Sequence, residues 1–214
     1  MAVARSQDLG PERWAEKHPS DLLLAEFIHR AANDFAIASI EVCNASKLAS
    51  YAAVQDHLEL VGARLQALAS IQRLLQPPGE APIHLGDRLC ELCHYYAEAR
   101  FAGQGAFVRL RTVEAWADPG PGWALLLIVS ELLTNAARHA FRAPGGLVEI
   151  ELARDGDMIR CEIADNGVGI GQETAARRGG TALIAELARS ADIAFVLQPR
   201  DRGSGFELRL ACSG

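Results

Sequence analysis

The order of apolar and polar residues changes character near residue 80. Before that point, apolar or small residues recur at alternating steps of four and three, a heptad seam typical of helices that pack on other helices. The seam of the first segment is Leu24, Ile28, Ala31, Phe35, Ala38 and Val42, and that of the second is Val54, Leu58, Val61, Leu65 and Leu68, continuing to Leu75. The pattern predicts two helices of about 25 residues each, the first capped by Ser20 or Asp21.

A short turn between residues 45 and 51 would join these helices into an antiparallel hairpin. One hairpin cannot bury both seams and their flanks, whereas a second copy could cover them. We therefore expect residues 1–76 to form a homodimeric four-helix bundle from two hairpins. Gln-Pro-Pro-Gly at residues 76–79 ends the second helix and predicts a hinge, followed by a second domain of residues 80–214.

After the hinge, helical and alternating segments follow one another. The patterns predict helices at 85–102, 122–141 and 181–190, and strands at 106–113, 147–153, 158–164, 193–198 and 205–211. Asp155-Gly156 is a hairpin turn signal between two of the strands. Hairpins together with helices on one face favour a two-layer α/β sandwich over a doubly wound parallel sheet, so the whole chain is expected to be α+β.

Composition narrows the possible partners and location. The 214 residues are 50% apolar, enough to fill a core, and carry a net charge of -6. This balance lacks the basic excess of nucleic-acid-binding proteins. The first 20 residues lack the apolar run of a secretory signal, and no stretch reaches the ~18 uncharged apolar residues of a membrane span. We therefore expect a cytoplasmic protein without a nucleic-acid partner or membrane span.

Cys90, Cys93 and His94 form a CxxCH pattern, which can attach c-type haem. The surrounding residues LGDRLCELCHYYAEARFA have apolar side chains at helical spacing, which favours a buried helix face instead. The other three cysteines are scattered among apolar residues, as expected for buried thiols in a reducing compartment.

Two helical segments carry candidate chemistry. On the first predicted helix, Glu26, His29 and Asn33 share one side and surround an imidazole with polar groups, although most lone surface histidines have no function. On the helix at 122–141, one stripe contains Glu131, Asn135, Arg138 and His139. A carboxylate and an amide there could hold hydrated Mg²⁺ while Arg138 meets phosphate. The alternative is a solvated helix face opposite the apolar one.

The string Asp165-Asn166-Gly167-Val168-Gly169 follows an alternating strand directly. Its glycines would allow the backbone to approach a ligand closely, and Asp165 could accept a hydrogen bond from an adenine amino group. A turn whose glycines serve only positive φ angles is the other interpretation.

Together these segments resemble histidine kinases of the HisKA/HWE-like subfamily. LLLAEFIHRAANDFAIA resembles the H box EIHHRVKNNLQ, SELLTNAARHAF resembles the N box ELVTNALKHAF, and IADNGVGI follows as a DxGxG box. The resemblance spans residues 20–211. It implies a phosphotransfer hairpin joined to a Bergerat-type ATP-binding sandwich.

The resemblance also implies roles for single residues. His29 is the phosphorylated histidine beside Asn33, Glu131 is the N-box acid, and Asn135 is the Mg²⁺ ligand. Asp165 would read adenine. The remaining ATP-site positions are Arg138 and His139 near the phosphates, Gly167 and Gly169 shaping the pocket, and Gly179 and Gly180 in the second glycine box.

This sequence departs from the family pattern in both halves. In the H box, Ile28, Ala32 and Asp34 replace the usual His, Lys and Asn. The second glycine box reads GGTAL instead of GLGL, and the ATP lid at residues 171–178 is short, although Arg177 and Arg178 could meet phosphate there. These changes concern ATP turnover more than the fold.

The implied function is a cytoplasmic histidine kinase without its own sensor domain. It would autophosphorylate His29 from ATP·Mg²⁺ and pass the phosphate to an aspartate on a response regulator receiver domain, with input from a separate sensor or regulator protein in trans. One alternative is a histidine phosphotransferase or adaptor whose ATPase-like domain is not catalytic. Another is a serine kinase of the anti-sigma type, which has no need of a helical hairpin carrying His29.

Overall fold

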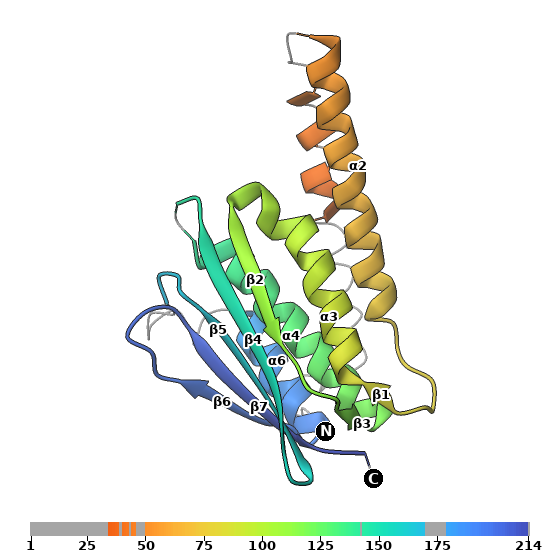
Figure 1. The fold of residues 1–214 in the computed structure, drawn as a ribbon, viewed down its shortest axis with the longest axis vertical. Helices are drawn as coiled ribbons and strands as arrows, with labels where there is room; N and C mark the ends of the chain where they lie inside the picture. The colour runs from red at the N-terminus through yellow and green to blue at the C-terminus, as the bar shows by residue number, and fades with distance from the viewer. Residues whose placement is uncertain are drawn as a thin grey trace, which may run out of the picture.

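A computed structural model describes residues 34–38, 40–42, 44–45, 50–141, 143–169 and 179–213, without the side chains of 179–182. The described parts of the first helix are helical, and α2 (Tyr51–Leu74) runs alongside them (Figure 1). Ser50 caps α2, because its hydroxyl accepts a hydrogen bond from the amide of Ala53. Glu41 joins the two helices through an ion pair with Arg64 and a 3.0 Å contact between its carbonyl and His57 Nε2.

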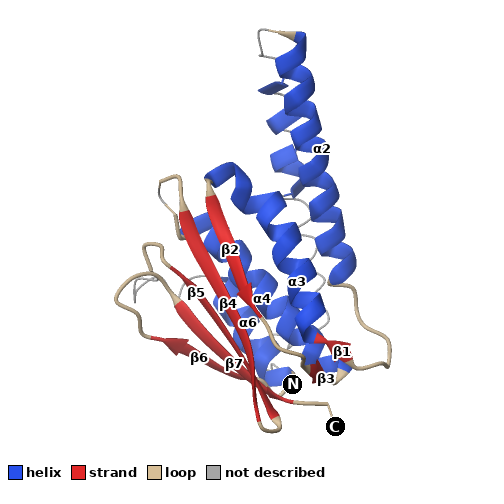
Figure 2. Cartoon of the chain, in the orientation of Figure 1, coloured by secondary structure: helices blue, strands red, loops and turns tan. Residues whose placement is uncertain are grey.

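The second domain is a sheet with helices on one face (Figures 1 and 2). Its five strands are β2 (Ala106–Arg111), β4 (Gly146–Asp155), β5 (Met158–Asp165), β6 (Ala194–Gln198) and β7 (Gly205–Ala211), in the order β2-β4-β5-β7-β6. The pair β2–β4 is parallel and the other pairs are antiparallel. The covering helices are α3 (Leu85–Tyr96), α4 (Pro119–His139) and α6 (Gly179–Ser190). The predicted two-layer arrangement of this domain is therefore confirmed.

The core lies between the helices and the sheet. It contains fully buried side chains from both layers, among them Leu89, Leu92, Leu125, Ile128, Leu133, Ile150, Leu152 and Ile159. The hydroxyl of Tyr96 crosses this layer and lies 2.7 Å from Ser130 Oγ and 2.9 Å from Thr134 Oγ1. It also donates to the carbonyl of Ser130 at 2.9 Å. The buried phenol therefore fixes α3 against α4 with its polar end satisfied.

Several boundaries differ from the sequence prediction. The helix expected at 85–102 is α-helical only to Tyr96, then continues as a π-helix, η1 (Ala97–Phe101), and a 3₁₀ turn, η2 (Ala102–Gln104). Gly105 ends the turn with a positive φ of 64°. α4 begins three residues earlier than expected, with Pro119 in its first turn. The pattern also missed a two-stranded pair, β1 (Ile83–His84) with β3 (Trp116–Ala117).

The C-terminal part of α2 packs on the second domain. Ile71 belongs to the same hydrophobic core, and Leu68, Leu74 and Leu75 pack against it. The indole nitrogen of Trp123 on α4 donates to the carbonyl of Leu75 at 3.0 Å. The hinge predicted at 76–79 therefore follows a helix end that is already attached to the second domain.

The helical hairpin is described only in part, and the predicted four-helix bundle remains a prediction. Within the described ranges, no helix is both long and apolar enough to cross a membrane. Cys93 is buried on α3 while Cys90 is exposed, as expected for an ordinary amphipathic helix.

Candidate functional site

The last turns of α4 carry the first part of the site. The carboxyl group of Glu131 belongs to a residue only 6% exposed, and its Oε1 accepts a hydrogen bond from Asn135 Nδ2 at 3.2 Å. This bond occupies the amide nitrogen, so the amide oxygen of Asn135 is the atom that can face a cation. Carboxylate and amide oxygens suit Mg²⁺, which takes few protein ligands and keeps several waters.

The glycine loop after β5 is pressed against the end of α4. The amide of Val168 donates to the carbonyl of Ala140 at 2.9 Å, and a Cβ on Gly167 would lie 2.3 Å from that oxygen. Only glycine can therefore occupy position 167 without moving the loop. Asp165 stabilises the same turn, because its Oδ1 accepts from the amide of Gly167 at 2.8 Å.

The turn between β6 and β7 supports Asp165 from the other side. The amide of Asp165 donates to the carbonyl of Ser204 at 2.9 Å, and Ser204 is only 8% exposed. Gly203 has a φ of +79°, and a Cβ there would lie 1.8 Å from the carbonyl oxygen of Asp165. Sequence reasoning missed this turn, although Gly203-Ser204-Gly205 before a strand is a signal for close backbone approach.

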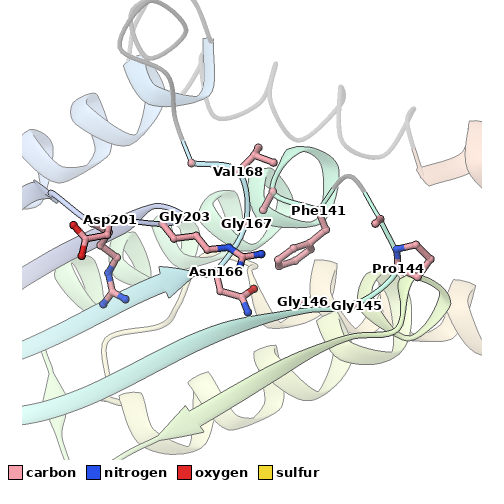
Figure 3. Close-up of a pocket in the computed structure, with 14 residues that line it drawn as sticks. Phe141, Pro144, Gly145, Gly146, Asn166, Gly167, Val168, Asp201 and Gly203 are labelled. Carbon is pink, nitrogen blue, oxygen red and sulfur yellow. The ribbon is translucent and has the colours of Figure 1, made fainter.

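A pocket of about 890 Å³ lies beside the glycine loop (Figure 3). The ring of Phe141 forms part of its wall and lies against Gly146, where a Cβ would come within 2.4 Å of the ring. Three loops line the pocket, through residues Ala140, Phe141, Ala143 to Gly146, Asn166 to Gly169, and Arg200 to Gly203. Its wall is thus apolar at Phe141 and carries two cationic side chains, Arg200 and Arg202, from the β6–β7 turn.

The structure separates some of the predicted site residues. Gly167 and Gly169 line the pocket, whereas Glu131, Asn135 and Asp165 do not. Arg138 borders a different cavity, of about 390 Å³, between α4 and the helical hairpin. His139 lies in the last turn of α4 and is exposed.

Four predicted positions are described little or not at all. Gly179 and Gly180 form the first turn of α6. His29 and Asn33 lie outside the described residues, as does the lid segment at 171–178. The roles of all the predicted site residues stay predictions.

Comparison with solved structures shows the same fold in histidine kinases and in a phosphotransferase. The histidine kinase domain of the blue-light activated histidine kinase EL346 from Erythrobacter litoralis matches with a TM-score of 0.57 and 18% identity, over 82% of this chain and 95% of that one. A bacterial phosphotransferase matches with a TM-score of 0.65 and 12% identity, over 92% and 98% of the two chains. Full-length ShkA in complex with AMPPNP matches with a TM-score of 0.51 and 19% identity, over 91% of this chain and 46% of that one.

Sequence comparison identifies the second domain. No curated protein sequence matches the chain. The model of the histidine kinase-like ATPase domain matches residues 102–209, which is half of the chain and runs from η2 to β7. This range includes the N-box helix, the glycine loop and the β6–β7 turn. The chain therefore belongs to the family of proteins with a histidine kinase-like ATPase domain.

Proposed function

We propose that this protein is an ATP-dependent protein histidine kinase that phosphorylates its own His29. The observation that carries the proposal is the contact between the glycine loop and α4, where Gly167 has no room for a side chain against Ala140. An ATPase-like domain that does not bind ATP would not require this contact together with Asp165 and the Glu131–Asn135 pair.

The described side chains support separate roles for Asp165 at the adenine and for Asn135 at Mg²⁺. One oxygen of Asp165 is occupied by the amide of Gly167, and the other can accept from the adenine amino group. Asn135, held by Glu131, would present its amide oxygen to Mg²⁺. Mg²⁺ neutralises charge on the phosphates during phosphoryl transfer. Gly167, Gly169 and the start of α6 at Gly179 and Gly180 would let the backbone follow the nucleotide.

The acceptor side rests on the H box. A ring nitrogen of neutral His29 would attack the γ-phosphorus of ATP in line, so that an N–P bond forms while the bond to the bridging oxygen breaks and ADP leaves. The proton of the imidazole would pass to solvent. In the sequence Asn33 follows one helical turn after His29, and Glu131 would be the acid of the N box. Arg138 and His139 would meet the phosphates. The phosphate would then pass from His29 to an aspartate of a response regulator receiver domain, and a separate sensor or regulator protein would supply the input.

Dimerisation through the hairpin belongs to the same proposal. Large apolar side chains on both helices are exposed in the single chain, including Phe35 and Tyr51 at 70% and 85%. Leu58 and Leu65 continue this row along α2 at heptad spacing from Tyr51. A second copy would bury such a row, as the predicted four-helix bundle requires.

Radiolabelled ATP tests the proposal directly. The purified chain should take up acid-labile label, His29→Ala should take up none, and His94→Ala should label like the parent. His94 is a suitable control because it is exposed on α3, where its contacts are a 3.6 Å ion pair with Glu98 and a ring contact with Tyr95. Acid-stable label would instead indicate the serine kinase alternative and end the histidine kinase proposal.

A histidine phosphotransferase is the second candidate. It is favoured by the match to the bacterial phosphotransferase over nearly the whole of both chains, and by the packing of α2 on the second domain. In that case the chain would neither bind ATP in calorimetry nor take label from it. It would accept phosphate at His29 from a phosphorylated receiver domain.

A further inference from the structure

One ion pair connects the H-box helix with the ATPase domain. Arg100 of η1 pairs with Asp34, 66 residues earlier in the chain, and both side chains are only 11% exposed. Asp34 lies five residues after His29 in the sequence. It is also one of the positions at which the H box departs from its family pattern.

The backbone around Arg100 has an unusual shape that brings it to this contact. Arg100 lies in the π-helix that follows α3, and π-helical turns are rare and often occur at functional positions. The η2 turn continues towards α4, where Gln104 Nε2 donates to the carbonyl of Ala137 at 2.9 Å. Gly103 lies beneath Arg64 of α2, since a Cβ there would be 2.2 Å from Arg64 Nη2.

The ion pair lies at a junction of four elements. The 390 Å³ cavity beside it is lined by the first helix, α2, the η1–η2 segment and α4. Among the described residues, two ion pairs cross this junction, Arg100 with Asp34 and Arg64 with Glu41. The third arginine, Arg138, comes from the N-box helix. The junction thus connects the H box with the helix that carries Asn135.

Burial makes the Arg100–Asp34 contact specific. The Nε atoms of Arg64 and Arg100 are buried and have no hydrogen-bond partner in the described part of the chain. The guanidinium of Arg100 therefore depends on its carboxylate partner, and removal of Asp34 would leave a desolvated, uncompensated charge. An exposed pair such as Arg109–Glu149, with side chains 51% and 44% exposed, carries no such penalty.

We propose that Arg100 is a positioning residue for phosphoryl transfer. Its ion pair with Asp34 holds the H-box helix in one orientation relative to the ATPase domain. This restricts the orientations in which His29 can meet the nucleotide. Phosphoryl transfer depends on such alignment more than on covalent chemistry. This inference rests on the proposed kinase function and adds a residue outside the H, N and glycine boxes.

The test compares charge variants of the full-length chain. Arg100→Gln and Asp34→Asn should lower the rate of label uptake from saturating ATP about tenfold, while the Kd for ATP stays unchanged. Arg100→Lys keeps the charge and should keep most of the rate. The exchanged pair, Asp34→Arg with Arg100→Asp, should recover most of the lost rate. Arg109→Gln is the control and should label like the parent.

Two outcomes would overturn the proposal. The first is that Arg100→Gln takes up label at the rate of the parent. The second is that Arg100→Lys is slow and the exchanged pair takes up label no faster than the single variants. If the parent itself takes no label, the kinase proposal fails separately. Amide hydrogen exchange then decides whether the ion pair holds the H-box helix in place. Faster exchange at residues 34–45 in Arg100→Gln than in Arg109→Gln supports it, and equal exchange refutes it.

Discussion

Replacing Gly203 by alanine should damage nucleotide binding through the backbone of Asp165. The new Cβ would lie 1.8 Å from the carbonyl oxygen of Asp165 and 3.0 Å from its Oδ1. Ordinary contacts of this kind are about 3.4 Å or longer, so the two chain segments must separate by more than 1 Å. That separation would break the 2.9 Å hydrogen bond between the amide of Asp165 and the carbonyl of Ser204.

The size of the effect follows from a comparison with Gly156. Both glycines have positive φ angles, +79° at Gly203 and +61° at Gly156, but a Cβ on Gly156 would meet nothing within 4 Å. Gly156→Ala therefore incurs only the conformational cost of about 1 kcal/mol. Gly203→Ala adds overpacking of about 1–3 kcal/mol and one lost hydrogen bond of about 1 kcal/mol. We expect it to lower the free energy of unfolding by about 2–4 kcal/mol more than Gly156→Ala.

Urea unfolding of both variants measures this difference, and calorimetry with ATP measures its consequence for binding. Gly203→Ala should lose ATP affinity under conditions where it is still folded, whereas Gly156→Ala should bind like the parent. Equal stability and equal affinity in the two variants would refute the argument that the β6–β7 turn positions Asp165.

Three further predictions concern α4 and the core. Asn135→Ala should abolish binding of Mg²⁺·ATP in calorimetry while the chain still folds, and an unchanged affinity would contradict the assignment of Asn135. Loss of its hydrogen bond to buried Glu131 should lower the free energy of unfolding by about 1 kcal/mol. Tyr96→Phe should lower the free energy of unfolding by about 1–3 kcal/mol in urea titrations, because the hydroxyls of Ser130 and Thr134 lose a buried hydrogen-bond partner. Burial raises the pKa of Cys93 and of Cys161 to about 12. Above pH 9 both thiols therefore stay protonated in the native state, whereas they lose their protons in the unfolded state. Between pH 9 and 12, each thiol should lower the free energy of unfolding by up to about 1.4 kcal/mol for every pH unit. Cys161→Ala should show a shallower fall, and an identical slope would contradict this reasoning.

Most of the second domain could be predicted because its elements are long and strongly periodic. The strand at 205–211 was placed correctly at both ends. A hairpin joins β4 and β5 as Asp155-Gly156 indicated, but its two turn residues are Gly156 and Asp157, because Asp155 still pairs with Met158. The pattern could not reveal the pair β1–β3, because each strand has only two residues. It also could not separate η1 from α3, because the change from α- to π-helical bonding leaves the order of apolar residues nearly intact.

The site was predictable where local sequence determines local geometry. Gly167 was identified because a glycine after a strand indicates close approach, and the approach is to Ala140. Gly203 and Arg100 were missed because their contacts join segments far apart in the chain: Gly203 meets Asp165, and Arg100 meets Asp34. Such pairings depend on the tertiary fold, which residue spacing does not specify. Asp34 was recognised only as a departure from the family pattern, without the partner that gives it a role.

The position of β7 in the sheet has a consequence for synthesis in the cell. β7 is the last strand in the sequence, yet it lies between β5 and β6 and is not at an edge. While the ribosome is still making residues 205–211, β5 has a bare hydrogen-bonding side and the hydrophobic core lacks Leu208 and Leu210. The nascent ATPase domain is then open to aggregation. The dimer proposed above uses helical segments that precede β7 in the sequence, so its formation does not require a complete ATPase domain.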